Sequence, residues 1–121
     1  EAIASKPRYE TIAEQLHLIV AEYLRLEEQA PKIEQISQEL HISSRTLQRQ
    51  LSDLGTSFKK IIEYERMNRC EQLLQDQRHL TDIAMKLGYS DQSALARAYK
   101  AYSGQTLLQK KQQLKNAINS G

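Results

Sequence analysis

Apolar residues recur every three or four positions along most of the chain, and no segment shows the strict alternation expected of a strand. This spacing is typical of amphipathic helices and predicts an all-α protein of about seven helices. Pro31, Gly55 and Gly88 mark helix ends, and the N-cap candidates are Ser43 or Ser44, Thr56 or Ser57, Thr81, and Asp91 or Ser90. The expected helices cover residues 9–28, 33–40, 44–54, 57–75, 81–87, 92–102 and 106–116.

An internal repeat organises this pattern, because a short helix, a tight turn and a second helix occur twice. The apolar positions of the short helix recur 47 residues later, and those of the second helix recur 48 residues later. The extra residue falls in the turn, where an insertion costs least. The arrangement is that of a helix-turn-helix, whose second helix enters the DNA major groove. The matching residues are Ile36, Leu40, Ile42, Leu47, Arg49, Leu51 and Leu54 in the first copy and Ile83, Leu87, Tyr89, Leu95, Arg97, Tyr99 and Tyr102 in the second.

The second helix of each copy carries an apolar stripe and, opposite it, a polar stripe with no acidic residue in its middle. Arg and Gln can pair with guanine and adenine edges, whereas Ser and Lys suit phosphates, so these stripes favour DNA binding. The residues expected to be buried are Leu47, Leu51 and Leu54 in the first copy and Leu95, Tyr99 and Tyr102 in the second. The residues expected to face outward are Ser44, Arg45, Gln48, Arg49 and Ser52 in the first copy and Gln92, Ser93, Ala96, Arg97 and Lys100 in the second.

Composition and charge agree with a folded, DNA-binding chain. Hydrophobic residues make up 40% and charged residues 26%, and the net charge of +2 divides into −4 over residues 1–42 and +6 over residues 43–121. The long helix of about 20 residues spans ~30 Å, close to the ~34 Å between successive major-groove entries on one face of DNA. No apolar run approaches the ~18 residues of a membrane span, so we expect no membrane partner. The single Cys70 suits a reducing compartment, so we expect a cytoplasmic location, associated with the nucleoid through DNA binding.

The residues of both copies resemble the DNA-binding domain of AraC/XylS-type transcription regulators. The similarity covers about residues 32–107, and both halves occur in order at the expected separation. The sequence departs from the family pattern at Leu107, where Pro is usual, and at Lys110 and Lys111, where Tyr and Arg are usual. The matching segments are residues 42–51, 55–58 and 83–106 and, in the long helix, Arg66, Cys70, Leu73 and Leu74.

The resemblance implies a bacterial regulator that binds double-stranded promoter DNA, with activation favoured over repression and with RNA polymerase as a partner. It also implies a small-molecule effector that acts only through a domain absent here, and because the chain begins with Glu1 rather than Met we expect it to be part of a longer protein. On the family pattern, the candidates for base contacts are Arg45, Gln48, Arg49, Gln92, Ser93 and Arg97. The candidates for phosphate contacts are Ser44, Ser52, Lys59 and Lys100.

No residue pattern indicates catalysis, a cofactor or a metal site. The three His residues lack ligand spacing, and Cys70 lies in an apolar stretch without a neighbouring base, so we expect an inert core thiol. The long helix carries charged residues at helical spacing, for which we expect mainly pairing along the surface, with Arg66 also able to tie the helix to a neighbouring lobe. These residues are Glu63, Glu65, Arg66 and Arg69.

The sequence predicts five segments: an N-terminal helix (1–31), a first helix-turn-helix (32–55), a linker helix (56–76), a second helix-turn-helix with a terminal helix (77–116), and a frayed tail (117–121). The N-terminal helix has an acidic outer face and an apolar stripe that needs burial, so packing on the first helix-turn-helix is favoured over a link to another domain. Two alternatives stay open: a helical protein-interaction module on the same scaffold, and the DNA-targeting domain of a larger enzyme. Exposed Arg, Gln and Ser argue against the interaction module, which would expose apolar residues instead.

Overall fold

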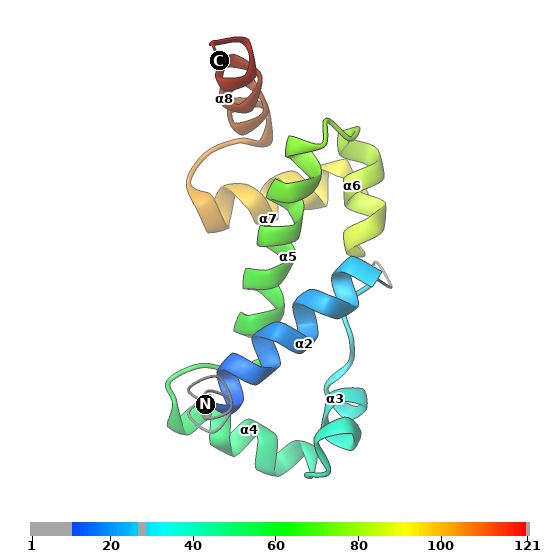
Figure 1. Ribbon diagram of the computed structural model, residues 1–121, viewed down its shortest axis with the longest axis vertical. Helices are drawn as coiled ribbons and strands as arrows, with labels where there is room; N and C mark the ends of the chain where they lie inside the picture. The colour runs from blue at the N-terminus through cyan, green and yellow to red at the C-terminus, as the bar shows by residue number, and fades with distance from the viewer. Residues whose placement is uncertain (1–10, 27–28, 121) are drawn as a thin grey trace, which may run out of the picture. The chain divides into compact units, whose positions relative to one another are not determined.

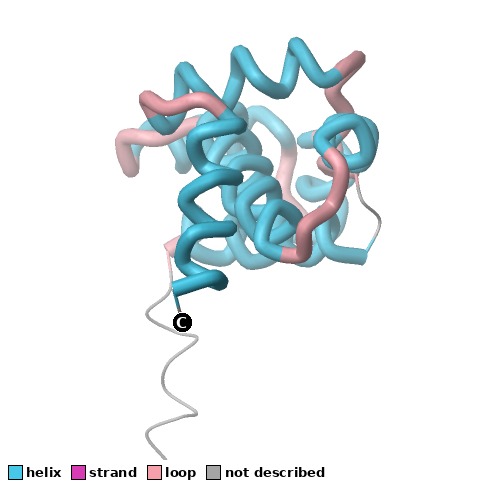
Figure 2. Tube along the Cα trace, turned by 90° about the horizontal axis from the view of Figure 1, so that it is seen from above, coloured by secondary structure: helices cyan, strands magenta, loops and turns pink. Residues whose placement is uncertain are grey.

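The computed structural model describes residues 11–26 and 29–120, and all regular secondary structure in these residues is helical (Figure 1). The all-α prediction is confirmed. Short loops connect the helices (Figure 2). The ends of the expected first helix, residues 9–10 and 27–28, lie outside the described residues. The helices are α2 (Ile12–Leu26), α3 (Ile33–Leu40), α4 (Ser44–Asp53), α5 (Phe58–Gln75), α6 (Leu80–Leu87), α7 (Gln92–Ser103) and α8 (Leu107–Ser120).

The chain divides between Glu65 and Arg66 into two compact units, each with its own apolar core. We call the part up to Glu65 unit 1 and the part from Arg66 unit 2. The boundary falls inside α5, so this helix contributes its first part to one core and its second part to the other. Unit 1 also contains α2, α3 and α4, and unit 2 contains α6, α7 and α8. Each unit therefore holds one copy of the repeat.

The core of unit 1 forms where one apolar stripe from each of its helices meets the others. The α2 stripe repeats at every fourth position and packs against the helix-turn-helix of α3 and α4, as its amphipathic pattern indicated. Full burial of a leucine or isoleucine side chain contributes about 1.5–3 kcal/mol. The buried residues are Leu16, Val20 and Leu24 of α2, Ile36 of α3, Leu47 and Leu51 of α4, and Ile61 of α5.

The core of unit 2 is built in the same way around the second half of α5. Cys70 is fully buried there, and burial, with a smaller contribution from the charge of Glu71, raises the pKa of its thiol to about 12. The thiolate needed for nucleophilic chemistry is therefore not formed near neutral pH, which agrees with the expected inert thiol. The other buried residues are Met67, Leu73 and Leu74 of α5, Leu80, Ile83, Ala84 and Leu87 of α6, Leu95 and Tyr99 of α7, and Leu107 of α8.

The turns of the two copies have the same backbone hydrogen bonds, so the repeat seen in the sequence is also a repeat of local structure. In unit 1 the amide of Ile42 donates to the carbonyl of Ser37 at 3.1 Å, and in unit 2 the amide of Tyr89 donates to the carbonyl of Ala84 at 2.9 Å. Both turns place the residue before this donor in the left-handed region, His41 with φ 60° and Gly88 with φ 87°. This bond pattern is that of a Schellman motif.

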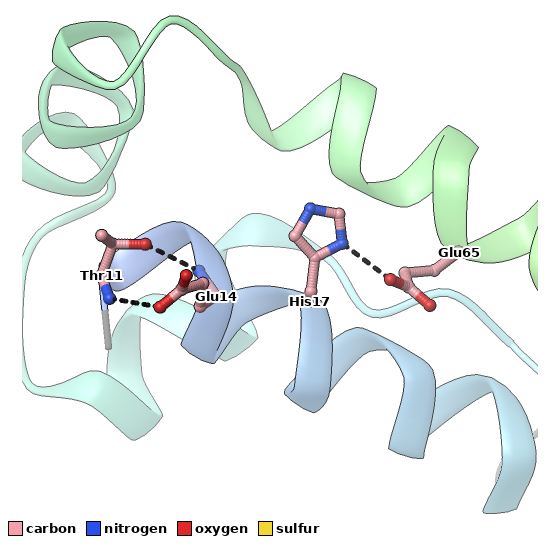
Figure 3. A network of polar contacts seen from close by, with 4 residues as sticks. All are labelled: Thr11, Glu14, His17 and Glu65. Carbon is pink, nitrogen blue, oxygen red and sulfur yellow. Dashed lines mark hydrogen bonds and ion pairs between the residues drawn. The ribbon is translucent and has the colours of Figure 1, made fainter. Parts of the chain in front are cut away.

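Helix starts follow the capping signals in the sequence. The Ser43 hydroxyl accepts from the amide of Thr46 at 3.0 Å, and an Asp91 carboxyl oxygen accepts from the amide of Ala94 at 2.8 Å. The N-caps lie 48 residues apart, so the extra residue of the second copy is in the turn, as predicted. At the start of α2, Thr11 and Glu14 form a reciprocal capping box, with bonds of 3.1 and 2.9 Å (Figure 3).

The terminal helix begins with a second capping box and runs further than expected. The Thr106 hydroxyl accepts from the amide of Gln109 at 3.0 Å, and the Gln109 side chain accepts from the amide of Thr106 at 2.8 Å. Leu107 follows as the first helical residue and is buried, so this departure from the family pattern still fills the core. The helix continues to Ser120, where we expected a frayed tail; Gln112 donates to Asn116 at 3.0 Å across one of its last turns.

Three predictions about individual positions were wrong. Leu54 is 48% exposed, because α4 ends at Asp53 and Leu54 leaves the apolar stripe as its C-cap. Tyr102 is 41% exposed, because Leu107 of α8 closes the core beyond Tyr99. Thr81 does not cap α6; His79 takes the N-cap position, so that the helix begins one residue earlier with the buried Leu80.

The expected surface pairing along α5 was also wrong for its central charges. Glu65 is 8% exposed and forms a 2.7 Å hydrogen bond with Nδ1 of His17, which joins α5 to α2 within unit 1 (Figure 3). The guanidinium of Arg66 lies 5.1 Å from the centre of the Tyr89 ring, so it ties α5 to the turn before α7, the second role expected for it. Arg69 donates to Gln72 at 2.9 Å.

Candidate nucleic-acid interface

The clearest candidate surface is the outward stripe of α4. Leu47 and Leu51 are fully buried and fix the rotation of this helix about its own axis. As a consequence Arg45, Gln48 and Arg49, the three candidates for base contacts in the first copy, are exposed, and they lie on the side away from the core. Ser52, a phosphate candidate, is exposed as well. The packing of unit 1 therefore presents two guanidinium groups and one amide on adjacent turns.

The remaining phosphate candidate of α4, Ser44, is half-buried rather than fully outward. Its hydroxyl lies 3.1 Å from the hydroxyl of Ser37, a buried residue of α3. This contact joins the first residue of α4 to the preceding helix across the turn. Ser44 thus holds the orientation of α4 relative to α3, a function that the outward pattern did not indicate.

The second candidate surface lies on α7 in unit 2. Leu95 and Tyr99 are buried, and Gln92, Ser93 and Arg97 are exposed, as the base-contact assignment requires. Lys100, the phosphate candidate, is exposed on the following turn. The exposed polar stripe is interrupted between Ser93 and Arg97, because Ala96, expected to face outward, is half-buried and packs against the core.

Two contacts hold the α7 surface in place. The Thr81 hydroxyl of α6 donates to the side-chain oxygen of Gln92 at 3.4 Å, at the start of α7. At the other face, the Tyr99 hydroxyl donates to Glu71 of α5 at 3.0 Å. Burial, together with this hydrogen bond and the charge of Glu71, raises the pKa of Tyr99 to about 12. The tyrosine is therefore a neutral structural donor rather than an aromatic platform for bases.

The charges of the two surfaces differ at the start of the helix. The N-cap of α4 is the neutral hydroxyl of Ser43, whereas the N-cap of α7 is the exposed carboxyl group of Asp91. An acidic N-cap suits the helix dipole but repels a phosphate at the same place. The surface of unit 1 also gains cations, because Lys59 and Lys60 are both exposed in the first turn of α5. Lys59 was predicted to contact phosphate, whereas Lys60, which follows it directly in the sequence, was not.

The comparisons with known proteins agree with this geometry. Residues 36–113 match the family described as "Helix-turn-helix domain", a span that contains α4, α5 and α7 entirely. The chain belongs to the AraC-type helix-turn-helix family. This family is one of DNA-binding transcription regulators. None of the chain's described helices is both long and apolar enough to cross a membrane.

Similar proteins are transcription regulators. The domain is 39% identical over 75 residues to the ornithine utilization regulator of Pseudomonas aeruginosa, covering 61% of this chain and 22% of that protein. It resembles the crystal structure of the transcriptional regulator CdpR from Pseudomonas aeruginosa with a TM-score of 0.72 and 30% identity, over 84% of this chain and 31% of that one. The crystal structure of a DNA-binding transcriptional dual regulator from Escherichia coli K-12 shares the fold, with a TM-score of 0.78 and 19% identity, over 88% of this chain and 95% of that one. The chain thus spans about a fifth of the length of the curated relative.

Among residues 11–26 and 29–120, no three His, Cys, Asp or Glu side chains are grouped so that they could hold a metal ion. Apart from the Asp91 carboxyl group, the polar groups that the two surfaces expose are guanidinium, amide, hydroxyl and ammonium groups. Such groups can donate hydrogen bonds to, and pair with, the negative charges of an anionic partner.

Proposed function

We propose that the AraC-type domain binds specific sequences of double-stranded promoter DNA by inserting α4 and α7 into major grooves. The observation that carries this proposal is the exposed stripe of Arg45, Gln48 and Arg49 on α4 opposite its buried leucines. Arginine can donate two hydrogen bonds to O6 and N7 of guanine, and glutamine can pair with N6 and N7 of adenine. No acidic side chain lies between these groups to repel the DNA backbone.

The two helices have different tasks in this proposal. The α4 surface reads base edges, supported by phosphate contacts from Ser52 and from Lys59 at the start of α5. The α7 surface has a narrower reading stripe, interrupted by Ala96, and an acidic N-cap at Asp91. It contributes base contacts from Gln92, Ser93 and Arg97, but more of its binding free energy comes from position and from the phosphate contact of Lys100.

The regulatory context follows from the family and from the share of its relatives that the chain covers. We propose that the domain is the DNA-binding part of a bacterial regulator that senses a small molecule through another domain and activates transcription by contacting RNA polymerase. The ornithine utilization regulator, of which this chain matches 22%, supports a larger whole protein. The place of action would be the cytoplasm, on the nucleoid.

The test is a matched pair of arginine substitutions. Arg49→Ala should weaken binding to a selected DNA site by about 1–3 kcal/mol, the value of a bidentate base contact, and should broaden the bases tolerated at one position. Arg25→Ala, which removes an exposed arginine from α2, should leave the affinity unchanged. Fluorescence anisotropy titrations at two salt concentrations measure both. Equal affinities of wild type and Arg49→Ala would assign Arg49 to the structure rather than to base recognition.

A further inference from the structure

Unit 1 has a second surface, on the outer side of α2, that the DNA-binding proposal does not use. A shallow groove of about 450 Å³ is lined by α2 and by one residue of α3, and its lining is mainly apolar. Leu18, at the edge of the groove, is 62% exposed. The lining residues are Leu18, Ile19, Glu22, Tyr23 and Glu39.

The apolar surface continues along α2 beyond the groove. Leu26 is 60% exposed and lies eight residues after Leu18, so the two leucines are about 12 Å apart along the helix axis. Glu22 stands between them on the same stripe. The whole surface, Leu18, Glu22 and Leu26 with the groove beside it, is an elongated strip that suits a helix better than a small molecule. We call it the α2 strip.

The charge of the α2 strip is negative. Its two carboxyl groups are Glu22 and Glu39; Glu39 accepts a hydrogen bond from the Tyr23 hydroxyl, and no cation pairs with it among the described residues. Arg25 pairs with Glu22 at 2.7 Å and offsets one of the two charges. A partner must therefore bring apolar side chains together with lysine or arginine.

The strip and the α4 surface point away from each other. The buried stripe of α2 and the buried stripe of α4 pack together in the core of unit 1, with Leu16 and Val20 on one side and Leu47 and Leu51 on the other. The exposed sides of the two helices are therefore turned outward in different directions. A protein that covers the α2 strip would leave Arg45, Gln48 and Arg49 accessible to DNA.

The chain itself contains a helix with the required chemistry. The terminal helix α8 carries three lysines and no acidic residue. Leu108 is 69% exposed, and Lys111 and Lys115 lie three and seven residues further on, so all three share one stripe. The neighbouring stripe of α8 packs into unit 2 through Leu107 and Leu114, so Lys111, which lies between the two stripes, is half-buried, whereas Lys115 is exposed. The outer side of α8 is thus a basic strip with an apolar anchor.

We propose that α8 of one copy of this domain binds the α2 strip of a second copy, with Leu108 in the groove and Lys111 and Lys115 facing Glu22 and Glu39. The contact is heterologous, because two different surfaces meet. One helix laid on another covers less surface than a stable dimer requires, so the association is weak and reversible in free solution.

On DNA the same contact would have a larger effect. Two copies held side by side on one molecule have a high effective concentration, and a weak contact between them makes their binding cooperative. This consequence rests on the proposed function, whereas self-association of the free domain does not. The experiment therefore uses the free domain, so that failure of the DNA-binding proposal and failure of this one are distinguishable.

The test is sedimentation velocity of the wild-type domain over a range of concentrations, with one substitution on each surface. Leu18→Lys and Leu108→Asp should each lower the association constant about tenfold or more, because each removes the burial of a leucine side chain and places a charge opposite charges of the same sign. Both residues are exposed, so the fold should be retained, and circular dichroism of each variant checks this. Met85→Lys is the matched control, since Met85 is 70% exposed on α6 and lies on neither surface.

A charge exchange then tests which surfaces meet. A variant with Glu22→Lys and Glu39→Lys and a variant with Lys111→Glu and Lys115→Glu should each lose self-association, and mixing the two should restore it, because the altered strip of one matches the altered helix of the other. Association that survives each of these variants would overturn the proposal, and so would a wild-type domain that stays monomeric at all concentrations. Loss in both variants without recovery on mixing would also overturn the assignment of α8 to the α2 strip.

Discussion

The hydrogen bond between His17 and Glu65 predicts a measurable coupling between α2 and α5. Nδ1 of His17 and Oε2 of Glu65 lie 2.7 Å apart, and the side chains are 35% and 10% exposed (Figure 3). The edge of the His17 ring also meets the ring of Tyr64, with 5.3 Å between centroids and 85° between planes. His17→Ala would leave the nearly buried carboxyl group of Glu65 without this partner.

The size of the coupling follows from the exposure of the two groups. Removing a hydrogen bond to a charged group costs about 1.5–3 kcal/mol. Water reaches the partly exposed His17 ring and can replace part of the lost bond, so we expect a value near the lower limit, about 1.5 kcal/mol. His17→Ala also removes the ring contact with Tyr64. A double-mutant cycle with Glu65→Ala is needed to separate the pairwise coupling from this additional loss.

Native-state hydrogen exchange is the suitable assay, because it reports on unit 1 separately. The amides of Leu47 and Leu51, in the core that α2 and α5 share, should lose protection in each single variant and show the coupling in the cycle. The exposed pair Glu22–Arg25 has the same 2.7 Å separation and is the control, for which we expect only ~0.2–0.5 kcal/mol. Equal couplings in the two cycles would refute the argument that burial of Glu65 sets the magnitude.

Three further predictions concern the core and the recognition helices. Leu51→Ala should destabilise unit 1 by about 2–5 kcal/mol, measured by urea denaturation, because it leaves a cavity in a fully buried site; a loss below about 1 kcal/mol would contradict the packing. Stability should fall as the pH rises through about 10 toward 12, because Tyr99 keeps its proton in the folded state, with a pKa of about 12, while the unfolded chain loses it near 10; Tyr99→Phe should reduce this fall and leave the part due to Cys70, whose pKa is also raised to about 12, and an unchanged fall would contradict the role of Tyr99. Asp91→Asn should keep the cap on Ala94 and tighten DNA binding by roughly fivefold at most, since one repulsive charge is removed; weaker binding in the titration would contradict it.

Local signals in the sequence predicted most of the helices. Ser43 and Asp91 begin helices and Gly88 ends one. Each acts through hydrogen bonds or backbone geometry within a few residues, so these helix ends can be predicted without knowledge of the fold. The stripes of Leu47 with Leu51 and of Leu95 with Tyr99 predicted the buried faces of α4 and α7 correctly, because the helical period alone determines which residues share a face.

The errors occurred where a distant residue or the end of an element decides the outcome. Glu65 was expected on the surface, because the 48 residues that separate it from His17 leave no local trace of their contact. Leu54 and Tyr102 were expected to be buried because each continues the apolar stripe of its helix. Leu54 lies beyond the end of α4, and in unit 2 Leu107 of α8 closes the core beyond Tyr99. Whether the exposed residues bind DNA depends on a partner, so their roles stay a prediction.

The central claim is that α4 recognises base sequence, and selection from a random pool of double-stranded DNA tests it most directly. The wild-type domain should enrich one sequence pattern, with an affinity that falls steeply as salt increases. The Arg49→Ala domain should fail to enrich one or two positions of that pattern while it keeps the others. A pool that stays random after selection with the wild-type domain, or an identical pattern from both domains, would contradict the account.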